Sequence, residues 1–126
     1  MNFAESVLKL VNEERSKVGA APLKLSSSLN RAATFRASEI TQEFDHTRPN
    51  GKDFFTVIDE EYSAVGENIA EGYSTPEEVM ECWMNSRGHR ENILRSDFTE
   101  LGVGYYRDKN SEYEHYWVQI FMRPMD

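Results

Sequence analysis

Hydrophobic residues recur at steps of three and four near the start of the chain, and this spacing predicts an amphipathic helix that ends near Gly19. Asn2 and Glu5 have the spacing of a capping box at its beginning. The apolar face of this helix consists of Phe3, Val7, Leu10, Val11 and Val18. A second stripe of the same period follows "LKLSSSL", whose serines are typical helix caps. This stripe consists of Leu29, Ala33, Ala37, Ile40 and Phe44, and its alanines indicate close packing against a neighbour.

The segment "STPEEVMECWMNSRG" carries the clearest helix signals in the chain. Thr75 is a suitable N-cap, Pro76 suits the first helical position, and Glu78 follows the cap by three residues. Gly88 is a typical helix terminator. These signals predict a helix from Pro76 to about Arg87.

The remaining pattern predicts strands and turns. "LGVGYYR" and "YWVQIFM" are rich in β-branched and aromatic residues, and we expect them to form an antiparallel hairpin with Trp117 and Phe121 in the core. "GENIA" is expected to be a short strand or an extended buried segment, and "DFFTVIDEEY" a short helix. The Asn50-Gly51 pair predicts a turn directly after His46. The fold class is therefore α+β, with a small antiparallel sheet of about three strands covered by helices.

Composition narrows the function classes. The 126 residues fit one domain, and no apolar run approaches the roughly 20 residues of a transmembrane helix. The net charge of −8 disfavours binding to nucleic acid or to anionic lipid surfaces. The single cysteine, Cys82, excludes an intrachain disulfide, and we expect it to be a small buried hydrophobe. No signal peptide precedes the first helix, so the chain is either retained in the cell or a mature domain without its leader.

Three ionisable residues lie beside turns and glycines: His46, Glu67 and His89. Two imidazoles and a carboxylate are the minimum for an open zinc site or for an acid and base pair. The chain lacks an HExxH or CxxC motif. The alternative is that both histidines are polar caps that form hydrogen bonds with loop backbone. Ser86 could complete a hydrolase triad, but no GxSxG elbow is present, and a serine near a helix end more commonly caps it.

Five blocks of sequence together resemble one known family. "HTRPNG", "GENIA", "WMNSRGHRENIL", "LGVGYY" and "YWVQIF" occur in the order and approximate spacing of the CAP superfamily, or SCP domain. This superfamily includes cysteine-rich secretory proteins, antigen 5 and plant pathogenesis-related proteins, and the resemblance is strongest to its bacterial branch. It covers residues 1–126 as a single CAP/SCP domain and implies a three-layer α-β-α sandwich. It also implies an extracellular or cell-surface location.

The resemblance further implies a cleft where two histidines and two glutamates converge. His46, Glu67 and His89 match three of these residues, whereas Ser86 stands where the second glutamate is expected. Gly88 is expected to end the helix so that His89 turns inward toward His46. In this arrangement His46 and His89 are the nitrogen ligands of zinc or another divalent cation, which two nitrogens hold only weakly. Glu67 would bind or polarise a metal-bound water.

Three functions are compatible with these expectations. The favoured one is an exported or cell-surface module that binds a lipid, glycan or peptide ligand in the cleft, or a protein partner. The second is a metal-assisted hydrolase or peptidase with Glu67 as general base. The third is a scaffold whose cleft is vestigial. Among neighbouring residues, Asn68, Arg90 and Asn92 are expected to hold loop backbone, and His115 to lie on the surface.

Overall fold

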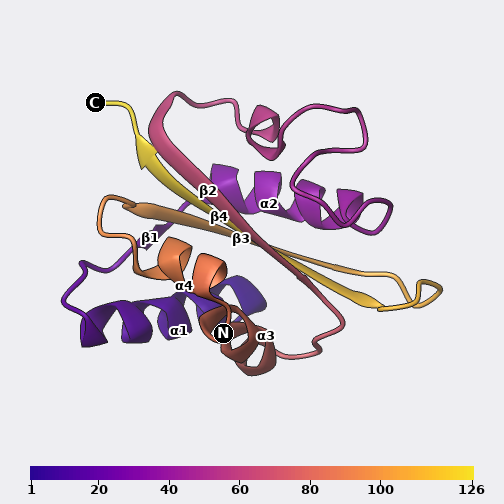
Figure 1. The fold of residues 1–126 in the computed structure, drawn as a ribbon, viewed down its shortest axis with the longest axis horizontal. Coiled ribbons are helices and arrows are strands. Elements are labelled where there is room, and N and C mark those ends of the chain that lie inside the picture. Colours follow the sequence, from indigo (N-terminus) through magenta and orange to yellow (C-terminus); the bar gives the residue numbers. More distant parts are fainter.

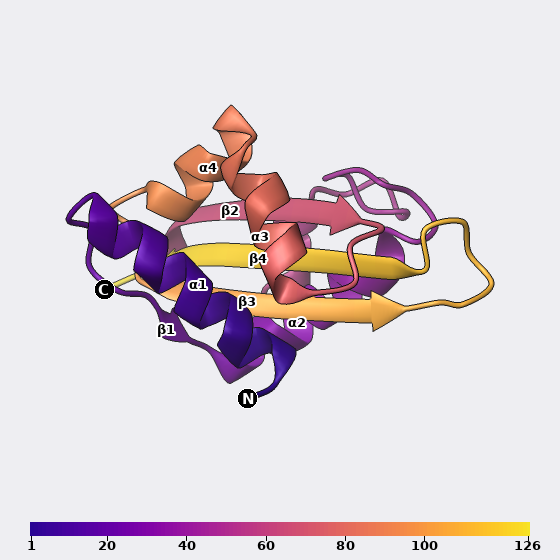
Figure 2. The same cartoon turned by 90° about the horizontal axis from the view of Figure 1, so that it is seen from below.

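A four-stranded sheet forms the middle layer of the computed structural model, which describes residues 1–126, and its strand order is β1-β3-β4-β2. One face is covered by α2 and the short 3-10 helix η1, and the other by α1, α3 and α4 (Figures 1 and 2). None of the helices is long and apolar enough to cross a membrane. The elements in chain order are α1 (Phe3–Lys17), β1 (Lys24–Leu25), α2 (Ser27–Glu39), η1 (Phe54–Val57), β2 (Tyr62–Glu71), α3 (Pro76–Met84), α4 (Arg87–Leu94), β3 (Glu100–Arg107) and β4 (His115–Pro124).

The three-layer sandwich is confirmed, but the expected antiparallel sheet of about three strands needs a correction. A fourth strand, β1, pairs with β3 in parallel through Lys24 and Leu25. Two residues are too few to produce a period-two pattern, so hydrophobicity could not predict this strand. The "GENIA" segment lies in β2, which is ten residues long and forms an edge of the sheet.

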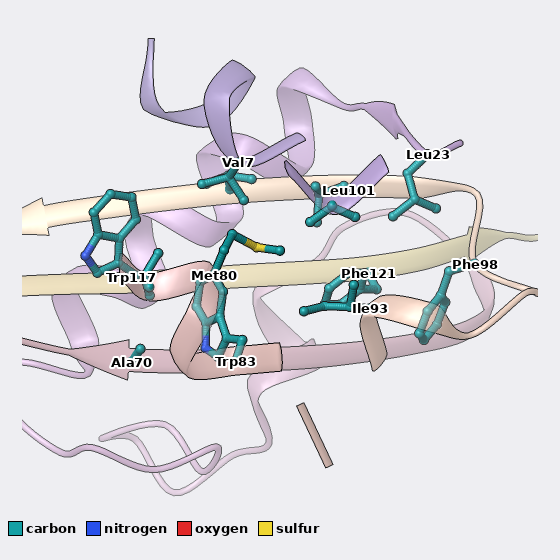
Figure 3. Packing of buried hydrophobic residues seen from close by; sticks show 13 residues of the cluster. Val7, Leu23, Ala70, Met80, Trp83, Ile93, Phe98, Leu101, Trp117 and Phe121 are labelled. Carbon is teal, nitrogen blue, oxygen red and sulfur yellow. The ribbon is translucent and has the colours of Figure 1, made fainter. Parts of the chain in front are cut away.

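The central strand β4 explains why the domain has two cores. Its side chains alternate between the two faces of the sheet. Trp117 and Phe121 pack with α1 and α3 in the larger core, as Figure 3 shows for one cluster of buried residues. Val118 and Ile120 pack under α2 in the smaller core. Because both faces are covered, β4 reads as a nearly continuous hydrophobic run.

Close contact between α2 and β3 depends on two glycines of the "LGVG" block. A Cβ atom on Gly102 would overlap the backbone of Leu29, and one on Gly104 would overlap the backbone of Ala33. Ala33 and Ala37 are fully buried on the same helix face. The prediction that the alanines of α2 allow close packing is therefore confirmed. Phe44, predicted on this stripe, is instead 46% exposed, because α2 ends at Glu39 before the stripe is complete.

The end of α3 also differs from the sequence prediction. The cap at Thr75 and Pro76 is confirmed, since the Thr75 hydroxyl accepts a hydrogen bond from the Glu78 amide. However, α3 ends at Met84 rather than near Arg87. The helix is interrupted at Asn85 and Ser86, and α4 begins at Arg87. Gly88 is thus not a terminator but part of the first turn of α4, and His89 reaches the site from a helix rather than from a turn.

Buried Arg15 fixes α4 to α1. Its guanidinium has no exposed surface and donates hydrogen bonds to the carbonyls of Ile93 and Arg95, each at 2.9 Å. These carbonyls lie at the C-terminal end of α4, where the helix dipole favours a cation. The contact orients the helix that carries His89.

Candidate functional site

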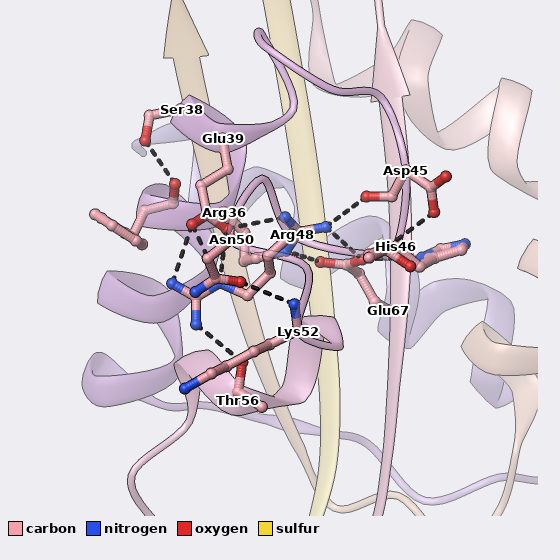
Figure 4. A network of polar contacts seen from close by, with 12 residues as sticks. Arg36, Ser38, Glu39, Asp45, His46, Arg48, Asn50, Lys52, Thr56 and Glu67 are labelled. Atoms are coloured by element: carbon pink, nitrogen blue, oxygen red, sulfur yellow. Dashed lines mark hydrogen bonds and ion pairs between the residues drawn. The ribbon is translucent and has the colours of Figure 1, made fainter.

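Glu67 is held by a buried arginine on the α2 side of the sheet. The carboxylate has no exposed surface, and Arg36 donates to it twice, from Nε to Oε2 at 2.8 Å and from Nη2 to Oε1 at 3.0 Å. The Arg36 side chain is also fully buried and bonds Glu39 at 3.0 Å (Figure 4). A paired arrangement of this kind satisfies the donors and acceptors that burial removes from water.

The same network positions His46. Oε1 of Glu67 lies 2.9 Å from Nδ1 of His46, and Arg36 donates to the carbonyl of Asp45 at 2.8 Å. The His46 side chain is 55% exposed, so its other ring nitrogen, Nε2, is available to a ligand. A carboxylate that accepts the Nδ1 hydrogen favours the tautomer with a free lone pair on Nε2.

The loop after His46 is anchored by a second ion pair. Arg48 donates to both oxygens of Glu39, at 3.0–3.1 Å, and to the Thr56 hydroxyl at 2.9 Å. Burial alone would raise the pKa of Glu39, but hydrogen bonds from Arg48 and Arg36 outweigh it and lower the pKa below its ordinary value. Gly51 adopts φ +86° in the predicted turn. The ion pair between Arg48 and Glu39 therefore holds the loop that carries His46 against α2.

His89 approaches from the opposite layer. Its carbonyl accepts a hydrogen bond from Asn68 Nδ2 at 3.1 Å, and Asn68 also bonds Gln119 and Asn92 at 3.0 and 2.9 Å. These amides fasten α4 to β2 and β4. Nδ1 of His89 is buried and has no hydrogen-bond partner. An unpartnered polar atom of this kind is commonly satisfied by a bound water, ion or ligand.

Both histidines line one cavity of about 460 Å³ along β2, the edge strand. His46 enters it from the loop after α2, and His89 from α4 on the other side of the sheet. The other lining residues are Phe44, Asp45, Ile69, Ala70, Glu71, Tyr73 and Cys82. Cys82, predicted to be buried in the core, is instead partly exposed at this cavity.

Their surroundings push the pKa values of the two histidines apart. The hydrogen bond that His46 donates to the Glu67 carboxylate raises the pKa of His46 despite partial burial. Burial lowers the pKa of His89, and the nearby charge of His46 lowers it further. Over an intermediate pH range His46 is therefore a charged imidazolium, whereas His89 is a neutral imidazole. Such a pair offers one proton donor and one free lone pair in the same cavity.

The cavity holds two imidazoles and is also lined by Asp45, Glu71 and Cys82. No group of three or more His, Cys, Asp or Glu side chains is arranged to hold an ion. His46 and His89 line the same cavity, and imidazole nitrogens are common ligands of divalent cations. Glu67 does not line the cavity, because it lies behind His46 and is bonded to Arg36.

The other residues singled out in the sequence take different positions. Ser86 is the N-cap residue of α4 without a side-chain capping bond, and it does not line the cavity. Arg90, expected to hold loop backbone, lies in α4 and donates instead to the carbonyl of Met84, the last residue of α3, at 3.1 Å. His115, predicted on the surface, is only 19% exposed. The Tyr105 ring of β3 stacks on it, and the Tyr105 hydroxyl forms a hydrogen bond with its Nδ1.

Arg36 is the functional residue that the sequence interpretation missed. It lies between Ala33 and Ala37 on the buried face of α2. An arginine within an apolar stripe needs an acceptor in the core. This position was therefore a signal for a buried carboxylate nearby, and Glu67 is that carboxylate.

Comparison with known proteins agrees with this architecture. Residues 8–121 match the family model described as CAP, the cysteine-rich secretory protein family. The uncharacterized protein YkwD of Bacillus subtilis (strain 168) is 38% identical over 125 residues, which cover 95% of this chain and 47% of YkwD. The chain thus spans about half the length of this relative.

Solved structures show the same fold. An extracellular protein containing an SCP domain from Bacillus anthracis str. Ames has a TM-score of 0.82 at 28% identity, over 95% of this chain and 40% of that one. An outer surface protein of Borrelia burgdorferi has a TM-score of 0.79 at 21% identity, over 99% and 97% of the two chains, and shares the fold. With the family model matching most of its length, the chain belongs to the CAP family of cysteine-rich secretory proteins, in a form similar to bacterial members.

Proposed function

We propose that the domain is an exported or cell-surface binding module whose cleft between His46 and His89 takes up a ligand, with a labile divalent cation held by the two imidazoles. One observation carries the proposal: two histidines from opposite layers line the same cavity. Polar groups that converge in one concave site commonly fix the orientation of a ligand. The extracellular and surface proteins with the same fold support the location.

The chemistry of the two histidines supports metal or ligand capture. Glu67 holds Nδ1 of His46 and leaves Nε2 unengaged, so Nε2 can bind a cation after it loses its own proton, while the lowered pKa of His89 favours a neutral ring. A cation bound there would supply a positive centre for carbonyl or carboxylate oxygens of a ligand. The cavity of about 460 Å³ is within the size range of small-molecule sites.

The geometry gives less support to a hydrolase in which Glu67 is the general base. Each oxygen of its carboxylate already accepts a hydrogen bond from Arg36, and Oε1 also contacts His46. A general base must reach the proton that it removes. Glu67 is better placed to orient His46 than to activate a cavity water. A peptidase role would therefore assign the base to a histidine.

Titration calorimetry of metal-free protein with zinc at neutral pH tests the proposal. We expect saturable binding with one zinc per chain for the wild type, and loss of binding in His46→Ala and in His89→Ala. His115→Ala is the matched control, because this histidine bonds Tyr105 away from the cavity and should leave zinc binding unchanged. A folded wild type that binds no zinc, or equal loss in all three variants, would contradict the proposal.

A further inference from the structure

The free edge of the sheet lies inside the histidine cavity. β2 is the outermost strand and pairs with β4 alone, so one of its two sides has no neighbouring strand (Figure 2). Along β2 the cavity is lined by Ile69, Ala70 and Glu71. A ligand of this cavity therefore meets strand backbone as well as the two imidazoles.

The register of β2 on β4 decides which backbone groups face this free edge. In an antiparallel pair every second residue exchanges its hydrogen bonds with the partner strand, and the residues between point their N–H and C=O groups away from it. The Gly72 amide donates to the His115 carbonyl at 2.8 Å, so in this register the even-numbered residues of β2 are the ones that bond β4. The N–H and C=O groups of Ile69 and Glu71 therefore point to the free edge.

Two side-chain donors agree with this orientation and leave part of the edge open. The Trp83 indole donates to the Ile69 carbonyl at 3.2 Å, and Asn92 Nδ2 donates to the Glu67 carbonyl at 3.3 Å. No hydrogen bond within the chain uses the N–H of Ile69 or either backbone group of Glu71. Two amide donors and one carbonyl acceptor are thus unpartnered where β2 lines the cavity.

These unpartnered groups match the backbone of an extended peptide. Ile69 is only 6% exposed, and a buried N–H without an acceptor is rare and costly. Donors on alternate residues of a strand are about 6.6–6.8 Å apart. An extended peptide has carbonyl groups at the same repeat and an N–H for the Glu71 carbonyl, whereas a fatty acyl chain has neither.

The walls of the cavity favour a free peptide segment over the edge of a second folded sheet. Phe44 and His46 stand on the α2 side of the edge, and Tyr73, Cys82 and His89 stand on the other side. A second folded domain would have to bring its own covering helices between these walls, whereas a single strand needs only the spacing of about 4.8 Å between neighbouring strands. Successive side chains of the peptide would point to the two walls in turn.

We propose that the cavity binds an extended peptide as a fifth strand of the sheet, hydrogen-bonded to the N–H groups of Ile69 and Glu71 and to the Glu71 carbonyl. The inference deepens the proposed function, because it names the ligand class of that site and rests on the cavity being a ligand site. Backbone hydrogen bonds supply the affinity in this mode of binding, and the two walls select among side chains.

An N-methyl scan of one peptide tests the backbone pairing. The probe is a fluorescently labelled peptide of about six residues in which valine and threonine alternate, with a lysine at each end for solubility, and binding is followed by anisotropy. An N-methyl group removes an N–H donor and obstructs the pairing only where that N–H faces β2. We expect the affinity to fall by about tenfold or more at every second position and to stay within about twofold at the positions between. Equal losses at all positions, or no saturable binding up to about 1 mM, would overturn the inference.

Glu71→Pro tests the same pairing from the side of the protein. Proline removes the N–H of residue 71 and places its ring where the peptide carbonyl would lie, but β4 loses no hydrogen bond because this N–H faces the free edge. Glu71→Val is the matched control, since it removes the same carboxylate and keeps the N–H. We expect peptide affinity to fall by about tenfold or more in Glu71→Pro and to stay within about threefold in Glu71→Val. Equal losses in the two variants would contradict the fifth strand.

Amide hydrogen exchange of the wild type needs no variant. Saturating peptide should slow exchange of the Ile69 and Glu71 amides by about tenfold or more, because both gain an acceptor. The amides of Asn68 and Ala70 already bond β4 and should exchange at the same rate with and without peptide. Unchanged exchange at Ile69 and Glu71 would rule out pairing along this edge.

The zinc titration distinguishes failure of this inference from failure of the proposed function. Zinc binding at His46 and His89 without the alternating effect of N-methylation would leave the histidine site in place and reject the fifth strand. The alternating effect in a protein that binds no zinc would reject the cation and support the fifth strand. A dimer that forms without peptide binding and is lost in Glu71→Pro would assign the edge to a second copy of the chain and overturn the inference.

Discussion

At the scale of single residues, Arg36 lies fully buried between two carboxylates, Glu39 and Glu67. It neutralises Glu67 in the core, and Glu67 in turn orients His46. Arg36 comes from α2, Glu67 from β2 and His46 from the loop after α2. The position of His46 therefore depends on a residue that does not line the cavity itself.

Replacement of Arg36 by methionine should be strongly destabilising. It would leave Glu67 buried without its cation, and breaking a buried ion pair from one side costs about 3–5 kcal/mol. The free energy of unfolding from urea denaturation measures this loss. Arg31→Met on the same helix is the matched control, because Arg31 is exposed and unpaired, and it should change stability by less than about 0.5 kcal/mol. Similar losses in both variants would contradict the role given to Arg36.

Glu39 should make stability depend on pH. Its pKa in the folded state is lowered, so the unfolded state binds a proton more readily. The stabilisation is therefore present above the ordinary pKa of a glutamate and is lost as pH falls through the lower folded value. We expect Glu39→Gln to be less stable than wild type at neutral pH, with a difference that shrinks on acidification. Unfolding free energies measured from pH 7 down to about 3 test this, and a difference constant with pH would contradict it.

The sequence identified His46, Glu67 and His89 but not the arginine that links them to the core. Histidines and glutamates beside turns are visible as local patterns. The partner of Glu67 is 31 residues away, and only the packing of α2 on the sheet that contains β2 brings the two together. Arg36 was detectable only as a charge within the apolar stripe of Ala33 and Ala37.

At the scale of secondary structure, regular periodicity and caps predicted α1, α2 and the start of α3. The parallel strand β1 and the break between α3 and α4 were not predicted. A glycine at position 88 resembles a helix terminator, but the chain turns earlier, at Asn85 and Ser86, and Gly88 takes part in α4. Two contacts fix α4: Arg15 of α1 donates to the Ile93 carbonyl, and Asn92 of α4 donates to Asn68 of β2, and neither contact is local in sequence.

The contact between α2 and β3 makes Gly104 intolerant of a side chain. A Cβ atom there would overlap the Ala33 carbonyl group, and backbone atoms cannot rotate away. Gly104→Ala should therefore cost at least about 1–3 kcal/mol of unfolding free energy. Gly88→Ala is the contrasting variant, because no atom lies within 4 Å of its Cβ and alanine favours a helix. Thermal unfolding should rank Gly88→Ala at or above wild type and Gly104→Ala below it, and the reverse order would refute this packing.

At the scale of the whole molecule, the candidate site lies where the layers meet at an edge of the sheet. His46 belongs to the layer that contains α2, and His89 to the layer that contains α3 and α4. The family resemblance predicted this convergence, whereas residue spacing alone left it open, because 43 positions separate the two histidines. The three-layer fold is what turns a distant pair into one cavity.

The measurement that tests this convergence most directly is a zinc titration followed by two-dimensional NMR of the histidine ring nitrogens. The chain has three histidines, so His115 serves as an internal control. We predict that the resonances of His46 and His89 shift together and saturate at the same zinc concentration, while those of His115 stay unchanged. Shifts in only one of the two cavity histidines, or equal shifts in all three, would contradict a shared site.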